Sequence, residues 1–551
     1  MAEFSLMRAR AVLLLGPGLV LAAVLAPVRA TNFGGHDEWL VLWMVRRGIA
    51  SFPYAQRPLA LLGLLPAGRL VPDGPAGCLL LHALYLAATG ALTAWMARRW
   101  LRLPVAVALL AGVAAAVWAP ADQARLDSVL AARYTAFALG AFTASALFVA
   151  AWRRTLRRRT ASAGALLAAG AVLAVVMASG QEAALAVMAA APLVAWCARP
   201  ADLRRRPHAA VALTLAWEAL LTLATLPLLR AMRSARGYQY QVATGFDPRP
   251  LRVAARLARQ LALAFLPAVR PAARELLVPT AALAAAALAA LWLALGPSGL
   301  PPAGRRLRAA RRRLARALAL GLALAGMGWL PFTLSALVAG GGRTQIFSAP
   351  GTGLALAALV GLLASALPRR AAGAALALAG CWIAAVAAGR TAALQRQWDA
   401  ESFWSGQSGT LVQLVALAPA ARPNTLLLLI DGHDTWRASY SFRHAVHLLY
   451  GPEVVGAVWN GIPFLYPLHV GPDGLHVEPM PAIRGPWGVS PTVHAADEVV
   501  ALRLEPDGRL RVLQEWPPDL PALAGAPYRP RARLVEGSAA RPPAWLHAAG
   551  R

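Results

Sequence analysis

The stretch AGCLLLHALYLAATGALTAWMARRWLR, residues 76–102, decides the fold. Its apolar part is long enough for a helix to cross the hydrocarbon core of a bilayer, which takes about 20 residues. It ends at Arg98, Arg99 and Arg102, and arginine accumulates on the cytoplasmic side of short membrane loops. The segment therefore predicts a transmembrane helix that runs from outside to inside.

Apolar runs flanked by arginine recur along the chain, and together they predict about 11 transmembrane helices. The N-terminus is then cytoplasmic, and the most basic inner loop covers residues 305–316. Residues 11–28 also have the basic flank of a signal peptide, but a poor cleavage site favours a retained first helix. The predicted helices cover residues 11–28, 76–97, 104 onward, 135–152, 162 onward, 183–197, 209–229, 276–295, 317–338, 352–367 and 371–388.

Composition agrees with a polytopic membrane protein. The chain has 551 residues, of which 58% are hydrophobic and 14% charged, and its mean hydropathy is +0.53. Its formal charge of +29 raises the possibility of nucleic-acid binding. All 54 basic residues are arginine, however, which indicates a GC-rich genome, so we predict no nucleic-acid partner. The three widely spaced cysteines are expected to be inert packing residues.

Adjacent carboxylates open the long loop between the first two predicted helices, in the motif His36-Asp37-Glu38-Trp39. The apolar stretch 38–47 places two tryptophans one helical turn apart and ends before a glycine, which predicts a short interfacial helix. A second short helix is predicted after Arg57, because proline suits the first helical position. These two helices would hold the carboxylates and Arg57 at the outer membrane surface.

This architecture and three short matches resemble the GT-C superfamily of membrane glycosyltransferases, which includes protein mannosyltransferases and lipid A aminoarabinose transferases. The first match is the acidic motif at residues 35–39, early in the first outer loop. The second is Asp127, in the second outer loop. The third is GRTQIFSAPGTGL at residues 342–354, which is similar to an arginine-then-proline entrance to a late helix but lacks the tyrosine after Arg343.

The resemblance implies a GT-C-like transmembrane domain over residues 1–389 and an activity. The expected enzyme moves a sugar from a polyprenyl-phosphate donor to an envelope glycan, lipid or protein, at the outer face of a bacterial inner membrane. Membrane lipids would surround it. Asp37 is the expected base and Arg343 the expected phosphate contact.

Transfer from a phosphate-linked sugar needs two kinds of side chain. A cation stabilises the phosphate that leaves, and a carboxylate takes the proton of the acceptor hydroxyl. Asp37 and Glu38 are the candidate catalytic residues, although successive helical residues differ by about 100 degrees and cannot point the same way. Capping of the helix N-terminus is the alternative role for this pair.

Five further residues are predicted to bind substrate, and three of them have structural alternatives. Asp127 would orient the acceptor or share a metal with the Asp37 region, or instead form a loop salt bridge. His36 would be a second base or ligand, or a structural hydrogen-bonding residue. Glu182 would line the pocket or cap a helix. The five residues are His36, Arg57, Asp127, Glu182 and Arg343.

Polar residues return after the last predicted span, which indicates a small extracytoplasmic α/β or β-rich domain over residues 390–551. We expect a loosely ordered tail from residue 517 onward. A divalent metal is possible at a group of acidic and histidine side chains, but their spacing matches no metal motif; acceptor recognition or packing is favoured. That group is Asp431, His433, Asp434, His444 and His447. Strands are predicted at 425–430, 475–478, 499–504 and 510–514, and a helix at 442–449.

Two non-catalytic classes remain as alternatives. A transporter or flippase would show inverted repeats and several charges inside its helices, whereas Glu218 is the one carboxylate well inside a predicted span and no repeat is visible. A membrane scaffold that presents the C-terminal domain would leave Asp37 replaceable. Whether Asp37 is essential therefore separates the enzyme from both alternatives.

Overall fold

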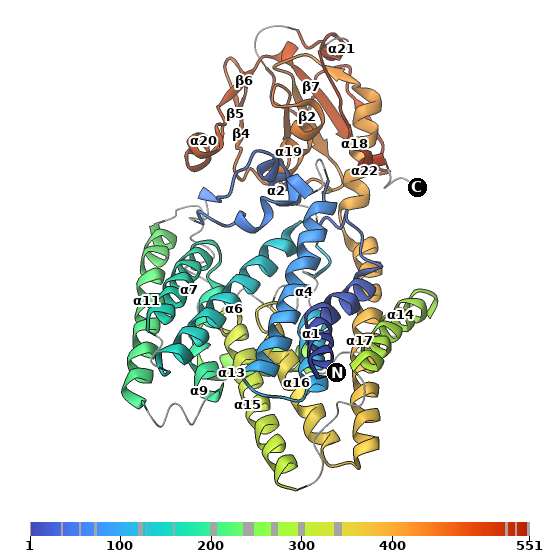
Figure 1. The fold of residues 1–551 in the computed structure, drawn as a ribbon. Coiled ribbons are helices and arrows are strands. Elements are labelled where there is room, and N and C mark those ends of the chain that lie inside the picture. The colour runs from blue at the N-terminus through green and yellow to red at the C-terminus, as the bar shows by residue number, and fades with distance from the viewer. Residues whose placement is uncertain are drawn as a thin grey trace.

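The computed structural model consists of a helical bundle with a smaller α/β unit stacked on one end (Figure 1). We refer to the smaller part as the C-terminal unit. The structure describes residues 2–34, 37–53, 57–70, 74–118, 125–127, 129–157, 160–198, 206–234, 247–265, 274–295, 304–334, 344–523, 527–534 and 537–547.

Six helices in the described residues are long and apolar enough to cross a membrane, which confirms the predicted helical fold and is consistent with a membrane protein. They are α4 (Ala76–Arg99), α6 (Leu130–Thr155), α7 (Thr160–Gly180), α11 (Pro207–Ser234), α15 (Arg305–Thr333) and α17 (Arg369–Glu401). Shorter apolar stretches coincide with the other predicted segments. They lie in α1 (Ala2–Leu25), α5 (Val105–Val117), α8 (Ala183–Ala189), α9 (Ala191–Ala198), α14 (Arg274–Leu295) and α16 (Ala349–Ala364).

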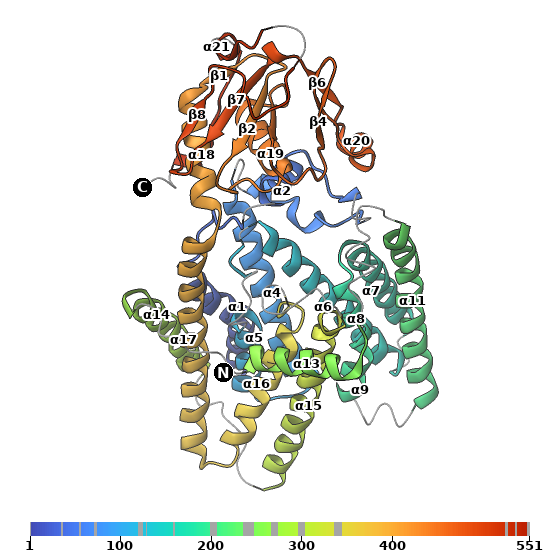
Figure 2. The same ribbon diagram turned by 180° about the vertical axis from the view of Figure 1, so that it is seen from behind.

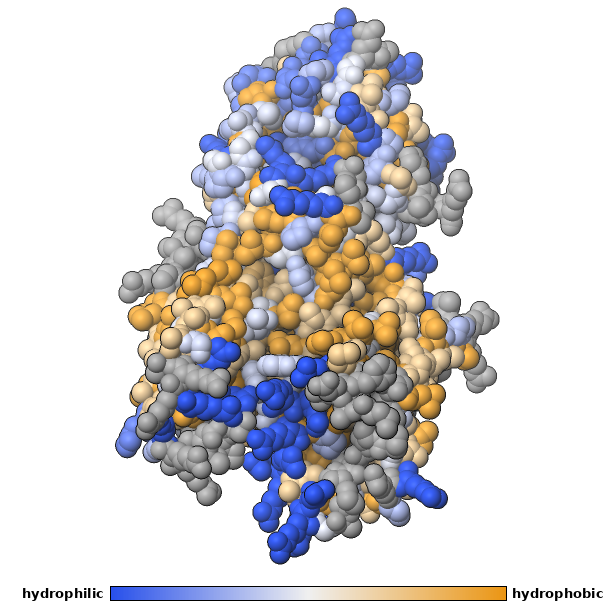
Figure 3. Space-filling view, viewed as in Figure 1, coloured by the Kyte–Doolittle hydropathy of each residue, from blue (hydrophilic) through white to orange (hydrophobic). Residues whose placement is uncertain are grey.

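Apolar side chains form a band across the bundle in the space-filling view (Figure 3). The surface is more hydrophilic above the band, on the C-terminal unit, and again at the opposite end. The exposed arginines at the start of α15 lie at that opposite end (Figure 1). A belt of exposed apolar side chains between two polar ends is what a bilayer-embedded surface requires.

Glycines let α15 and α16 pack with their backbones in contact. A Cβ atom on Gly321 would lie 2.6 Å from the backbone nitrogen of Ala355. A Cβ on Gly351 would meet the backbone of Ala325, on the facing helix. Small residues at such crossings permit the close approach that stabilises helix pairs in membranes.

The segment between α1 and α4 contains the predicted short helix, α2 (Asp37–Arg46). It ends as predicted at Gly48, whose φ of 69° is the left-handed conformation that favours glycine. All its residues from Glu38 to Val45 are buried, so the helix is covered by protein on every side. It lies between the bundle and the C-terminal unit (Figure 1).

The second predicted helix of this loop is replaced by a turn and two short helical pieces. Phe52 and Arg57 form a two-residue antiparallel bridge, and the Leu61 amide donates to the Ala50 carbonyl over 2.8 Å. These bonds engage backbone groups that a helix starting at Pro58 would need. The helical pieces are therefore a 3₁₀ turn, η2 (Leu62–Leu64), and α3 (Ala67–Leu70).

The C-terminal unit is built on a four-stranded sheet in the order β3-β2-β7-β8. Three strands are parallel and β8 is antiparallel at the edge. Helix α19 (Ser439–Tyr450) connects β2 to β3, as parallel neighbours require a crossover. Three of the four predicted strands, β2, β7 and β8, and the predicted helix, α19, are found here, whereas β3 was not predicted. The strands are β2 (Leu426–Asp431), β3 (Val455–Val458), β7 (Val499–Leu504) and β8 (Leu510–Val512).

A second, antiparallel sheet lies beside the first (Figure 1 and Figure 2), with β5, the fourth predicted strand, between β4 and β6. Its strands are β4 (Leu468–Gly471), β5 (Gly474–Val477) and β6 (Thr492–His494), and α20 (Pro481–Trp487) lies between β5 and β6 in the chain. The predicted boundary at residue 389 lies within α17, which continues to Glu401. Helix α18 (Trp404–Leu417) then leads into the unit.

The expectation of a loosely ordered tail is wrong for its described parts. Ala420 and Ala421 form β1, which pairs with β9 (Ser538–Ala539) from the tail. Two short helices, α21 (Pro530–Arg533) and α22 (Ala544–His547), flank β9. Trp545 packs its ring among other aromatic rings. The composition of the tail did not predict this order, because a single tryptophan ring provides a large contact surface.

The crossing of α15 and α16 predicts a sharp difference between two glycine substitutions. Gly351→Leu should lower the thermal midpoint by roughly 10 °C or prevent folding, because overpacking of a close contact costs about 1–3 kcal/mol or more. Gly326→Leu, on α15 where an added Cβ meets nothing, should stay within about 2 °C of the parent. Thermal unfolding in detergent, followed by size-exclusion chromatography, measures both; equal midpoints would contradict this account.

Candidate functional site

Helix α2 contacts α19 along its length, and this contact fixes Asp37. The Tyr440 hydroxyl on α19 donates a hydrogen bond to Asp37 Oδ1 over 2.7 Å. Further along both helices, the Trp43 ring lies 4.4 Å from the His444 ring and 6.4 Å from the His447 ring. The α1–α4 loop of the bundle and the C-terminal unit thus meet around the Asp37 carboxylate.

Trp39 is the centre of an aromatic cluster that holds this arrangement together. Its Nε1 donates to Gln407 Oε1 over 2.8 Å, and the Gln407 amide donates to the Thr435 carbonyl. Four rings have centroids 5.2–6.0 Å from the Trp39 ring. They belong to Phe33, Trp404, Trp436 and Trp545. Segments from both ends of the chain therefore meet on one buried side chain.

The two adjacent carboxylates have different roles. Glu38 is 2% exposed, and its Oε1 accepts a hydrogen bond from the Gly34 amide over 2.6 Å. Asp37 is half-buried, with the Tyr440 phenol on one oxygen. Side chains of successive helical residues point about 100 degrees apart around the helix axis, so the two carboxylates face different surroundings. The Glu38 carboxylate binds the loop before α2. The other, Asp37, is only half-buried.

Arg57 and Glu182 form an ion pair at the loop that follows α2. Arg57 Nη2 lies 2.5 Å from Glu182 Oε1. The bridge to Phe52 positions Arg57, and Glu182 makes no cap hydrogen bond to α8. The structure therefore brings together two residues predicted to bind substrate, which lie 125 positions apart.

Arg133 completes a basic cluster beside this pair. Its guanidinium lies 5.1 Å from the centre of the Phe52 ring and donates to Gln181 Oε1 over 3.4 Å. Arg133 Nε and Glu182 Oε2 are buried without a hydrogen-bond partner among the described residues. A buried guanidinium with an unused N–H is a ready donor to an anionic ligand.

Asp127 has the contacts of a structural residue. Its Oδ1 accepts hydrogen bonds from the Val129 and Leu130 amides, where α6 begins. Arg125 beside it donates to the carbonyls of Ala116 and Val117 at the end of α5. These contacts satisfy helix ends. The predictions for His36 and Arg343 lie outside the described residues.

The acidic and histidine group considered for a metal serves other purposes in the fold. Asp431 accepts hydrogen bonds from the His433 and Trp436 amides, and Asp434 forms an ion pair with Arg437. His444 is buried against Trp43. Within the described chain, one set of side chains lies close enough together to share a metal ion, namely His469, His476 and Glu478. It includes no member of the predicted group.

A cleft of about 1110 Å³ opens between the C-terminal unit and the start of α4. Its lining includes two arginines, Arg46 and Arg541, one carboxylate, Glu453, and apolar residues such as Pro75 and Trp545. Arg46 lies nine residues after Asp37 on α2, so the cleft begins roughly 13 Å along the helix from the carboxylate. The cleft is therefore a separate surface near Asp37.

Sequence reasoning missed Tyr440 and gave Arg133 no role of its own. Tyr440 lies 403 positions from Asp37, and no local pattern joins them. Arg133 does carry a signal, since it is a charge one turn inside an apolar helix, and such charges are functional candidates by default.

Comparison with known proteins adds no relative. No protein-family model matches the chain, and neither a characterised protein nor a solved structure shows significant similarity to it. The functional argument therefore depends on the residues and contacts described above.

Buried histidines make the α2–α19 contact sensitive to acid. Burial, together with the charges of Arg443 and Arg47, lowers the pKa of His447 to about 3. Burial lowers the pKa of His444 well below 6.5, and His447, Arg443 and Arg47 add to this. In the unfolded chain both imidazoles take up protons near pH 6.5. Stability is therefore unaffected above that pH and falls as the pH falls from about 6.5 towards 3.

We predict that the thermal midpoint of the purified protein falls by on the order of 5 °C between pH 7.5 and pH 5. His447→Gln should show a smaller fall, because it removes one of the buried histidines whose pKa is lowered in the folded protein. His208→Gln, a change at an exposed histidine at the start of α11, should behave like the parent. Differential scanning fluorimetry in one detergent measures all three; a midpoint independent of pH would contradict the assignment.

Proposed function

We propose that this chain is a GT-C-type membrane glycosyltransferase that moves a sugar from a polyprenyl-phosphate donor to a cell-envelope acceptor. The observation that carries the proposal is the Asp37 carboxylate on a buried helix, with the Tyr440 hydroxyl 2.7 Å from one oxygen. A general base must be held in position to act on a substrate proton. A carboxylate on an immobilised helix meets that requirement.

The proposed reaction uses Asp37 as the base. Asp37 takes the proton of the acceptor hydroxyl while the hydroxyl oxygen attacks the anomeric carbon of the donor sugar. The bond between that carbon and the phosphate oxygen breaks, its electron pair stays on the phosphate, and polyprenyl phosphate leaves. Tyr440 acts as a positioning residue, because its hydrogen bond keeps the carboxylate in one orientation.

The leaving phosphate gains negative charge and needs cations near it. Arg57 and Arg133 are the proposed source, since both come from the segments that follow or face α2. Glu182 holds Arg57 in place, while the buried Nε of Arg133 has no hydrogen-bond partner among the described residues. Arginine binds phosphate oxygens in a geometry that lysine cannot reproduce.

The membrane part supplies a surface for the donor's hydrocarbon chain. An apolar groove of about 510 Å³ lies between α1 and α14, and is lined by residues that include Leu19, Leu283 and Leu291. We propose that it receives a polyprenyl chain. We also propose 11 membrane spans with a cytoplasmic N-terminus, because the shorter apolar helices coincide with the segments that the arginine pattern predicts.

Asp37→Asn tests the proposal directly. Transfer of labelled sugar from a set of polyprenyl-phosphate donors into envelope fractions should fall by about 100-fold or more, since a general base contributes 10²–10⁴-fold. Asp434→Asn is the matched control, because Asp434 is an exposed carboxylate of the C-terminal unit paired with Arg437; it should retain parental activity. Equal thermal midpoints for the three proteins exclude misfolding.

Tyr440→Phe refines the same test. It removes one hydroxyl and should lower the turnover rate by roughly 10-fold while the KM for the donor stays near the parental value. Parental activity in Asp37→Asn would remove Asp37 as the base. Absence of transfer by the parent from every donor would favour a transporter or scaffold.

A further inference from the structure

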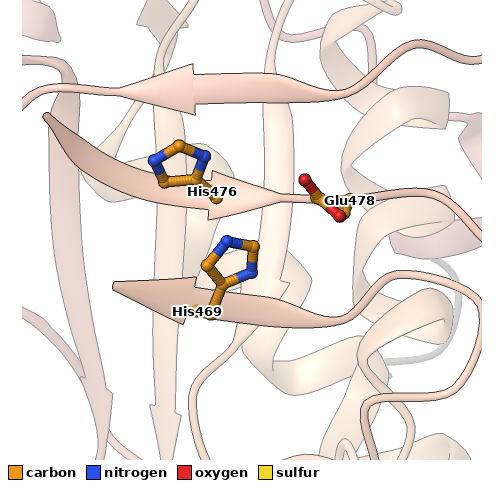
Figure 4. A group of neighbouring side chains, drawn as sticks. All are labelled: His469, His476 and Glu478. Carbon is orange, nitrogen blue, oxygen red and sulfur yellow. The ribbon is translucent and has the colours of Figure 1, made fainter. Parts of the chain in front are cut away.

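The outer face of the β4–β5 hairpin carries two histidines and a glutamate. His469 on β4 is the direct cross-strand partner of His476 on β5. Their rings stack with centroids 4.8 Å apart and an interplanar angle of 16°. Glu478 lies two residues after His476, so its side chain leaves the same face. Figure 4 shows the three side chains together.

This face is open to solvent, whereas the opposite face of the same sheet is buried. Leu475 and Val477 on β5 point to the buried side, as does His494 on β6. His494 is held there by the Asn424 carbonyl and the Thr492 hydroxyl. His469 has no hydrogen bond or ion pair in the described structure; its ring contact is with His476. Hydrophobic packing therefore does not explain why histidines occupy the outer face.

The three side chains offer ligand atoms within 4.8 Å of one another. Tetrahedral ligands around a zinc ion at about 2.0–2.1 Å are roughly 3.4 Å apart. Side-chain movements of about 1 Å close the difference, and exposed rotamers permit them. The backbone needs no change, because the strand register already pairs the two histidines.

Asp473, in the turn of the hairpin, supports His476. Its Oδ1 lies 2.6 Å from His476 Nε2. A carboxylate on one ring nitrogen leaves the other nitrogen to bind a metal and fixes the ring orientation. Asp473 is thus placed to orient His476 as a metal ligand without binding the ion itself.

We propose that His469, His476 and Glu478 bind one zinc-class divalent cation, with a fourth position open to water or an anionic ligand. Two imidazoles and one carboxylate suit zinc, nickel or copper better than magnesium or calcium, which prefer all-oxygen sites. Arg484 lies 3.7 Å from Glu478. It competes weakly for the carboxylate and can pair with an anion in the open position.

The experiment uses the full-length protein in detergent, purified without a histidine tag and stripped with a chelator. Zinc is titrated by calorimetry, and cobalt absorption reports the ligand geometry. The parent should bind one zinc ion per chain. His469→Ala and His476→Ala should each weaken binding by about 100-fold, and Asp473→Asn by about 10-fold. His433→Ala, at an exposed histidine elsewhere in the same unit, should bind like the parent.

The site variants change side chains on the solvent-facing side of the hairpin and none in the core, so their thermal midpoints without metal should match that of the parent. Zinc should raise the midpoint of the parent but not of His469→Ala, since an ion that binds the folded state stabilises it. No zinc binding by the parent would overturn the proposal. Binding that survives unchanged in both histidine variants would also overturn it.

Discussion

The burial of α2 between the bundle and the C-terminal unit is the constraint on which the rest of the structure depends. Trp39 is 2% exposed and contacts rings from four segments: the loop after α1, α18, the segment after β2, and α22. A buried tryptophan removes 150–250 Å² of surface from water. Its indole nitrogen donates a hydrogen bond to Gln407, so no hydrogen-bond donor is left without a partner at the centre of the cluster.

That packing gives the two adjacent carboxylates, Asp37 and Glu38, different surroundings. Glu38 is enclosed and closes the loop through Gly34, while Asp37 keeps partial exposure and gains the Tyr440 hydroxyl. The same packing buries His444 beside Arg443 and Trp43. A rigidly held carboxylate and an acid-sensitive contact therefore arise from one helix pair.

The bundle meets its own constraint by different means. Glycines let α15 and α16 approach until their backbones touch, because apolar side chains gain little from packing against each other instead of lipid. At the end of the bundle next to the C-terminal unit, charged side chains form ion pairs, as Arg57 and Glu182 do. Others bind the backbone at a helix end, as Asp127 does at the start of α6.

The sequence by itself determined the local elements. Apolar runs with arginine ends located the membrane helices, Gly48 marked the end of α2, and short apolar runs between turn residues located β2, β5, β7 and β8. These features follow from periodicity and turn chemistry, which act between near neighbours. The sequence also identified Asp37 and Glu38 as adjacent carboxylates, but not that one is buried and the other half-exposed.

Only the tertiary structure decided which polar residues meet. Tyr440 reaches Asp37 across 403 positions and Glu182 reaches Arg57 across 125, while strand register places His469 opposite His476. Sequence spacing carries no direct information about such contacts, because they depend on how whole elements pack. The failed helix after Arg57 has the same cause, since a bridge to Phe52 and a bond from Leu61 to Ala50 outweighed a local preference.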